Sequence, residues 1–352
     1  MDRSTKGPRY RTHRLTAVVA ALLVGISLAA SPAEALAAPR APDAERDPSL
    51  KPARVGFFEA GSSYETHRAG FSLNVAGERV VHRVFAITAL PGDALAINID
   101  GGSDGADYQL RYGAGEVRLS GSRAWEWRAP DEPGVYPLRI DAGSGDFVHL
   151  NVLVMHDREH VTGGDLHGYA IGAYRSEPLR GDPAYLPPEG FVEAVAGYED
   201  VLVSPHFTLA QFLCKQPGER RFLAISTPLV RKLETVLEAV NDAGISTRSF
   251  HVMSGFRTPA YNASIGNKTV YSRHLWGDAA DIYVDVDGNR QMDDLNGDGR
   301  SDVEDARVLY GIVEGIERGD DAIQDGGLGL YRRNAAHGPF VHVDARGQSV
   351  RW

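Results

Sequence analysis

The chain has 352 residues, which is more than one typical domain requires and enough for two. Hydrophobic residues make up 43% of it, so the sequence can bury a substantial core and is not generally disordered. The formal net charge of -10 argues against nucleic acid as a partner, because phosphate binding needs a basic surface. A single cysteine, Cys214, excludes an intrachain disulfide, and its apolar neighbours predict a small buried hydrophobe.

Residues 1–37 have the three-part pattern of a secretory signal peptide. Basic residues between Lys6 and Arg14 precede the apolar run 15–30, and small residues follow in 33–38. The apolar run is short for a hydrocarbon core of about 30 Å, which favours a cleaved signal over a membrane anchor. We therefore expect an exported protein, periplasmic or secreted and associated with the cell wall, with no stable membrane span after cleavage.

The next two segments differ in composition. Residues 38–53 are rich in proline and charge and predict a linker. In residues 54–155, short runs of alternating apolar and polar residues are separated by turn signals, which is typical of an all-β, immunoglobulin-like sandwich. The expected strands are 71–75, 80–85, 94–99, 108–112 and 148–154. Residues 125–140 resemble the closing hairpin of such domains, and the ligand of the sandwich is left open.

Residues 156–203 are irregular and predict a linker or an ordered loop region. From 204 to 352 the pattern becomes mixed, and an α+β domain is expected there. Ser226 or Thr227 caps a helix with Pro228 in its first turn and apolar residues at helical spacing as far as Val240. A strand is expected at 249–254.

The stretch 272–281, SRHLWGDAAD, places His274 and Asp281 seven residues apart with small residues between them. A later strand, 340–344, carries His342. Two histidines and one carboxylate are the ligand types of a catalytic zinc site with an open position for water. Taken alone, the stretch is equally consistent with an ordinary turn that enters a strand.

Four segments in order, 254–257 (SGFR), 272–274 (SRH), 277–282 (GDAADI) and 340–344 (FVHVD), resemble the zinc D-Ala-D-Ala carboxypeptidase family, peptidase family M15. Its wider superfamily includes peptidoglycan endopeptidases. The resemblance covers 204–352 and implies an antiparallel sheet with helices. It also implies that His274, Asp281 and His342 bind zinc, and that Arg257 binds the substrate carboxylate or stabilises the oxyanion. His337 matches a second active-site histidine of some members.

The sequence departs from several relatives at one position. They place a glutamate three residues before the last zinc histidine as the general base, whereas this chain has Pro339. Two residues remain as candidates for the base, His337 first and Asp344 second. The alternative for Asp344 is to orient His342 or another ligand.

An acidic insertion at 285–305 follows Asp281. Its second part matches a twelve-residue calcium loop, with Gly299 at the sharp turn, and predicts calcium ligands at Asp294, Asn296, Asp298, Arg300 (through its carbonyl), Asp302 and Asp305. The acidic and amide residues between 285 and 293 either complete this site or make another. The alternative is an acidic, solvated turn.

Together these features predict an exported zinc metallopeptidase that acts on the peptide part of peptidoglycan at bonds involving D-amino acids. A carboxypeptidase that removes terminal D-Ala and an endopeptidase that cuts cross-links both fit the resemblance. The alternative from another class is a cell-wall-binding protein that contains zinc but does not turn over, which the missing glutamate favours.

Overall fold

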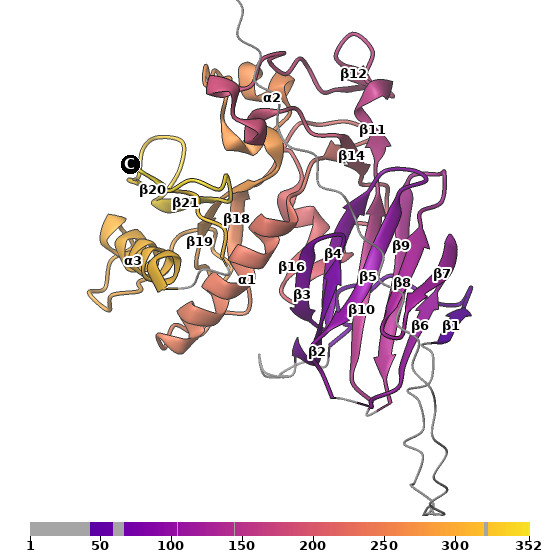
Figure 1. Ribbon diagram of the computed structural model, residues 1–352. Helices are drawn as coiled ribbons and strands as arrows, with labels where there is room; N and C mark the ends of the chain where they lie inside the picture. The colour runs from indigo at the N-terminus through magenta and orange to yellow at the C-terminus, as the bar shows by residue number, and fades with distance from the viewer. Residues whose placement is uncertain (1–42, 59–66, 104, 144, 320–322) are drawn as a thin grey trace, which may run out of the picture. The chain divides into compact units, whose positions relative to one another are not determined.

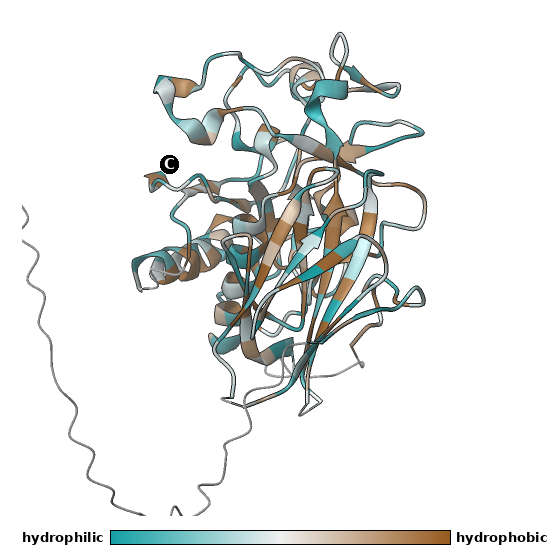
Figure 2. Cartoon of the chain, turned by 45° about the vertical axis from the view of Figure 1, so that its right-hand side comes forward, coloured by the Kyte–Doolittle hydropathy of each residue, from teal (hydrophilic) through white to brown (hydrophobic). Residues whose placement is uncertain are grey.

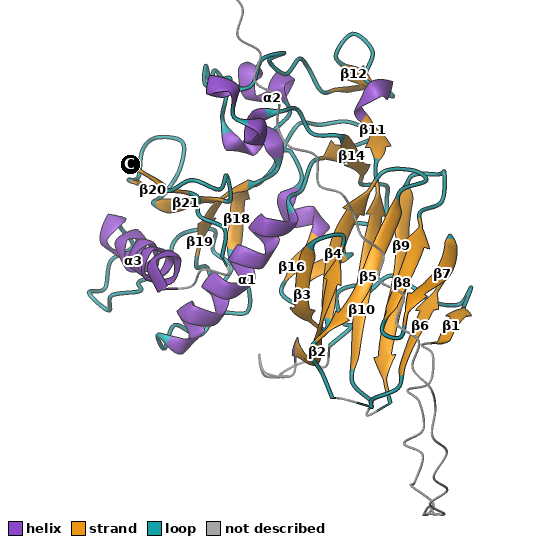
Figure 3. Cartoon of the chain, in the orientation of Figure 1, coloured by secondary structure: helices purple, strands orange, loops and turns teal. Residues whose placement is uncertain are grey.

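The computed structural model describes residues 43–58, 67–103, 105–143, 145–319 and 323–352, and strands outnumber helices throughout them (Figure 3). The predicted signal peptide at 1–37 lies outside the described residues. No helix in the described ranges is both long and apolar enough to cross a membrane. The described part of the fold is therefore rich in sheets, with its α-helices confined to the C-terminal part.

Two five-stranded sheets occupy the N-terminal half, and neither closes into a barrel within the described residues (Figure 1). The first has the order β1 (Asp43–Arg46), β6 (Tyr108–Tyr112), β9 (Gly134–Ala142), β10 (Phe147–Val154) and β4 (Val84–Ala89). The second has the order β3 (Glu78–His82), β2 (Arg68–Val75), β5 (Ala94–Asp100), β8 (Ala124–Arg128) and β7 (Glu116–Gly121).

Period-two patterning explains how these strands bury one face. In β5 the side chains of Leu95 and Ile97 are buried while their neighbours are exposed, and in β8 Trp125 and Trp127 are fully buried. Figure 2 shows the same alternation of hydrophobic and hydrophilic residues along the strands. Buried residues of both sheets belong to one hydrophobic cluster, so the sheets share a core.

The structure corrects two expectations and adds a strand elsewhere. The run 80–85 is not one strand, because β3 ends at His82 in one sheet and β4 begins at Val84 in the other. Residues 125–140 do not form a hairpin, because β8 pairs with β5 and β7 whereas β9 pairs with β6 and β10 in the other sheet. The connection with Pro130 and Pro133 carries the chain from one sheet to the other. The expected linker 38–53 contains β1, which pairs parallel with β6.

Residues 156–203 form short ordered elements rather than long ones. They are β11 (His156–Asp157), η2 (Arg158–His160), β12 (Asp165–Leu166), β13 (Tyr169–Ala170), η3 (Leu179–Gly181), η4 (Pro183–Tyr185), β14 (Gly190–Glu193) and the first part of β15 (Leu202–Ser204). Tyr185 packs with Trp276, with ring centroids 5.5 Å apart. This region therefore contacts the turn that carries His274.

The C-terminal part contains the third five-stranded sheet. Its order is β18 (His251–Ser254), β19 (Ala279–Tyr283), β21 (Phe340–Asp344), β20 (Gly327–Tyr331) and β22 (Val350–Arg351). The helices are α1 (Thr227–Asp242), α2 (Pro259–Ser264) and α3 (Val303–Gly319); β16 (Phe207–Thr208), η5 (Leu209–Phe212), β17 (Phe222–Leu223) and η6 (Arg273–Trp276) complete the elements.

Helix α1 contacts both halves of the described chain. Its apolar face is buried in the shared core, and Pro228 lies in its first turn as predicted. Glu238 accepts a hydrogen bond from Arg68 of β2, with Nε and Oε1 3.0 Å apart. The fully buried Lys232 donates to Glu317 of α3 at 2.6 Å and to the backbone carbonyl of Asp344 at 2.7 Å. The helix therefore connects β2, α3 and the end of β21.

Candidate metal centre

Sheet register places two of the three predicted zinc ligands side by side. Asp281 of β19 and His342 of β21 are directly paired residues of neighbouring antiparallel strands. Paired residues on one face of such a ladder have Cβ atoms about 5 Å apart, so their side chains meet. The third predicted ligand, His274, lies on η6, which comes just before β19 in the chain.

The turn between His274 and β19 depends on Gly277. It ends η6 with φ of 69°, a left-handed conformation that favours glycine. A Cβ atom at this position would lie only 2.1 Å from the carbonyl oxygen of Ala224. Arg273 and Asp278 brace the same turn, with Nε and Oδ1 3.0 Å apart and both side chains buried. Glycine is therefore required at 277 for conformation and for space.

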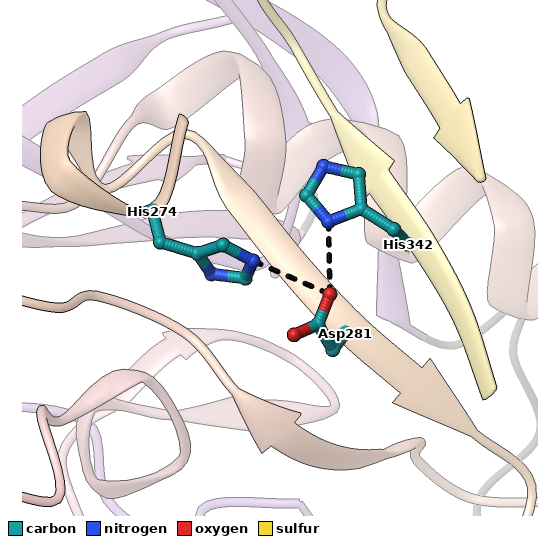
Figure 4. Close-up of side chains that lie close together, drawn as sticks. All are labelled: His274, Asp281 and His342. Carbon is teal, nitrogen blue, oxygen red and sulfur yellow. Dashed lines mark hydrogen bonds and ion pairs between the residues drawn. The ribbon is translucent and has the colours of Figure 1, made fainter. Parts of the chain in front are cut away.

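The three predicted ligands converge on one point (Figure 4). Oδ1 of Asp281 lies 2.8 Å from Nδ1 of His342 and 3.3 Å from Nε2 of His274. All three residues are buried, and their ligand atoms lie within 4.8 Å of one another. The structure thus brings together three residues that span 68 positions of sequence between 274 and 342.

Each histidine has its outer nitrogen held by another group. Nδ1 of His274 lies 2.7 Å from the carbonyl oxygen of Gly255 and donates to it, which leaves Nε2 directed at Asp281. Nε2 of His342 lies 3.3 Å from Oδ2 of Asp344, which leaves Nδ1 at the centre. Metal-binding histidines in proteins show this arrangement, because the outer hydrogen bond fixes the ring and its tautomer.

The electrostatics of the cluster favour an ionised carboxylate. Burial alone would raise the pKa of Asp281, but the two histidines hold that pKa well below its usual range. Burial lowers the pKa of His274. Burial acts in the same direction on His342, but its hydrogen bonds to Asp281 and Asp344 prevail and raise its pKa to about 9. A cation at the centre would take over the role of the proton on His342.

Asp344 lies behind His342 rather than beside the cavity. It is fully buried, accepts a hydrogen bond from the backbone N–H of Gly327 at 2.7 Å and pairs with Arg346. These contacts hold the carboxylate in place against His342. The geometry therefore favours, for Asp344, the alternative that the sequence left open, which is to orient His342.

The centre opens into a cavity of about 520 Å³. Arg257 lines it and donates from Nη2 to Oδ2 of Asp281 at 2.9 Å and from Nε to Oγ of Ser254 at 2.8 Å. Aromatic rings and further polar side chains form the rest of the wall, among them Tyr271, Arg346, Tyr331 and Trp352. Arg257 thus presents a cation at the edge of the candidate metal centre, where a carboxylate or oxyanion would be stabilised.

His337 also lines this cavity but does not join the cluster of three. Its Nδ1 donates to the carbonyl oxygen of Gly338 at 2.8 Å, and its Nε2 accepts from the side-chain amide of Asn334 at 2.7 Å. The ring packs edge-on against Phe340 with centroids 4.8 Å apart. A proton transfer by His337 would therefore require Nε2 to leave Asn334.

The predicted calcium loop is ordered by its own backbone. Asp294 accepts from the N–H groups of Gly297 and Gly299, each at 2.7 Å. Asp305, fully buried at the start of α3, accepts from Leu295 and Asp302, each at 2.8 Å. The structure does not bring three of the loop's carboxylates within 4.8 Å of one another. Calcium binding by Asp294, Asn296, Asp298, Arg300, Asp302 and Asp305 stays a prediction.

The sequence did not identify two features of this region. The cavity is also lined by Arg346, Tyr331 and Trp352. For Arg346 alone the sequence held a signal, which is the alternation of side-chain direction continued beyond β21. The Gly255 carbonyl that fixes His274 carries no side-chain signal. The structure also gathers Asp285, Asp287 and Asp293, from the stretch that the sequence left open as part of the calcium loop or as another site.

Comparisons of the chain with protein-family models, with curated proteins and with solved structures find no match.

Proposed function

We propose that this chain is a zinc metallopeptidase that hydrolyses peptidoglycan peptides at bonds involving D-amino acids. The observation that carries the proposal is the convergence of His274, Asp281 and His342, with both outer imidazole nitrogens already held. Two histidines and one carboxylate are the protein ligands of many catalytic zinc sites and leave one coordination position open. The donor set therefore fits zinc better than calcium or magnesium, which prefer oxygen alone.

Zinc held by these three side chains would supply Lewis acidity toward a carbonyl oxygen and activate water as a nucleophile. Arg257 would orient the anionic end of the substrate or stabilise the developing oxyanion, because its guanidinium lies at the edge of the centre. His337 would accept or return a proton after its ring nitrogen leaves Asn334. Asp344 would keep His342 in the tautomer that presents Nδ1.

The substrate class comes from the resemblance of the four motifs, and the cavity supports it. A peptide stem that ends in D-amino acids offers a carboxylate for Arg257 and small side chains for the space beside Tyr271 and Trp352. We further propose that residues 54–155 form an immunoglobulin-like sandwich in a protein exported to the periplasm or the cell wall.

Mass spectrometry of purified muropeptides tests the proposal. Monomeric and cross-linked muropeptides are incubated with the zinc-loaded chain, with its His274→Ala variant and with a His160→Ala control. His160 is exposed in η2 and does not line the cavity. Loss of one terminal alanine identifies a carboxypeptidase, and conversion of dimers to monomers identifies an endopeptidase. In either case we expect activity to disappear in His274→Ala and to persist in His160→Ala.

The second candidate function is a zinc-containing protein that binds the cell wall without cleaving it. Pro339 favours this candidate, because several members of the resembled family carry at this position the glutamate that acts as general base. Stoichiometric zinc together with retention on isolated cell walls, but with every muropeptide unchanged, would select it over the peptidase.

A further inference from the structure

A second group of acidic side chains lies in the loop that follows β19. Asp285, Asp287 and Asp293 each offer one carboxylate oxygen, and the three oxygens lie within 4.8 Å of one another. The loop is closed by its backbone, since Asp293 N–H donates to the Val284 carbonyl at 2.9 Å and Val286 N–H donates to Asp293 Oδ2 at 2.8 Å. The three carboxylates are therefore held together by the fold.

Asp285 supplies an independent indication of a ligand. Its side chain is 4% exposed, and its Oδ2 accepts a hydrogen bond from the backbone N–H of Arg290 at 3.0 Å. Its Oδ1 is buried and has no hydrogen-bond partner among the described residues. A buried carboxylate oxygen without a donor is costly, and native proteins seldom leave one unless water or an ion satisfies it.

The nearby histidine does not compensate for this charge. Nδ1 of His251 lies 3.6 Å from Oδ2 of Asp285, but burial lowers the pKa of His251, so the ring is neutral at pH 7. Burial, together with the charges of Asp287 and Asp285, raises the pKa of Asp293. Three carboxylates that repel one another around one point need a positive charge to be stable together.

We propose that Asp285, Asp287 and Asp293 bind one divalent cation of the calcium class. All of the gathered ligand atoms are carboxylate oxygens, which calcium prefers. Zinc is a poorer match, because its protein sites usually include nitrogen or sulfur ligands. Waters and backbone carbonyls would complete the six to eight ligands that calcium takes. The site is separate from the centre at His274, Asp281 and His342.

The gathered group includes no carboxylate of the predicted calcium loop at 294–305. There the carboxylates of Asp294 and Asp305 accept hydrogen bonds from backbone N–H groups of their own loop. At the new site Oδ1 of Asp285 has no such donor. Because Asp285 follows Asp281 by four positions, a cation here would fix the end of the strand that carries a proposed zinc ligand.

Calcium titration of the full chain tests the proposal. The zinc-loaded chain and its Asp298→Asn and Asp287→Asn/Asp298→Asn variants are titrated with calcium chloride by calorimetry, and terbium luminescence is measured in parallel. Asp287 and Asp298 are both exposed, so neither substitution removes a core contact. Asp298→Asn disables the predicted loop at 294–305 and leaves the new site intact.

We expect Asp298→Asn to bind one calcium equivalent with a Kd of about 1 mM or tighter, and the double variant to bind it at least about tenfold more weakly. Two results would overturn the proposal. One is the absence of calcium binding in Asp298→Asn at calcium concentrations up to about 10-fold above that Kd. The other is equal affinity in the single and double variants. Circular dichroism of both variants shows that they are folded before the titrations are compared.

Discussion

Gly277→Ala tests whether the turn between His274 and Asp281 sets the geometry of the centre. The new methyl group would lie 2.1 Å from the Ala224 carbonyl oxygen and 2.8 Å from the Ile225 nitrogen. Ordinary contact distances exceed 3.4 Å, so the backbone on one side has to move by about 1 Å. Movement of the turn at 277 would displace His274 relative to β19.

The cost has two parts that a matched variant separates. Alanine in the left-handed conformation costs about 1–2 kcal/mol, and forcing atoms into filled space adds about 1–3 kcal/mol. Gly244 also has positive φ, 88°, but nothing lies within 4 Å of its added Cβ. We expect Gly244→Ala to lose about 1–2 kcal/mol of unfolding free energy and Gly277→Ala to lose about 2–5 kcal/mol.

Urea denaturation measures the two losses, and a chelator competition measures zinc affinity in the same proteins. We expect zinc binding to weaken by at least about tenfold in Gly277→Ala, because ligand displacement acts directly on the metal. Gly244→Ala should bind zinc as the unmodified chain does. Equal stability losses in the two variants, with unchanged zinc affinity, would refute the steric argument.

Three further outcomes are expected. Arg257→Lys should lower kcat/KM on muropeptides by about 10²–10³ while zinc content stays the same, because lysine lacks the planar fork that holds an oxyanion. Burial, with Arg139 nearby, lowers the pKa of His149 from 6.5 to about 4, so the free energy of unfolding should fall as the pH drops from 6.5 to 4. His149→Leu should remove up to about 3 kcal/mol of that fall, as measured by denaturation at pH 7 and pH 4. Lys232→Met should cost about 3–5 kcal/mol in urea denaturation, because Glu317 and the Asp344 carbonyl lose a buried donor; a loss below 1 kcal/mol would contradict this account.

Local patterns in the sequence predicted the local elements well. The alternation in 94–99 and 108–112 corresponds to β5 and β6, and the apolar spacing after Pro228 corresponds to α1. The three zinc-ligand candidates were also available, because family-like motifs occur in order. In each case the signal lies within a few residues of the feature that it predicts.

Long-range pairing was not available in the same way. The turn residues around Pro130 resemble a hairpin turn, but the strands on either side belong to different sheets. Nothing within 38–53 indicates that β1 pairs with β6. Among the acidic residues of 285–305, spacing favoured the loop at 294–305, whereas the structure brings Asp285, Asp287 and Asp293 together. Which partners meet is decided by the whole fold.

Helix α1 has a consequence for how the chain unfolds. Its Glu238 pairs with Arg68 of β2, and its Lys232 donates a hydrogen bond to Asp344 at the end of β21, just beyond His342. Loss of either half would leave charges on α1 without their partners, so both halves should unfold in one cooperative transition. A metal bound at one end would then slow hydrogen exchange of backbone amides at the other, in strands that never contact it.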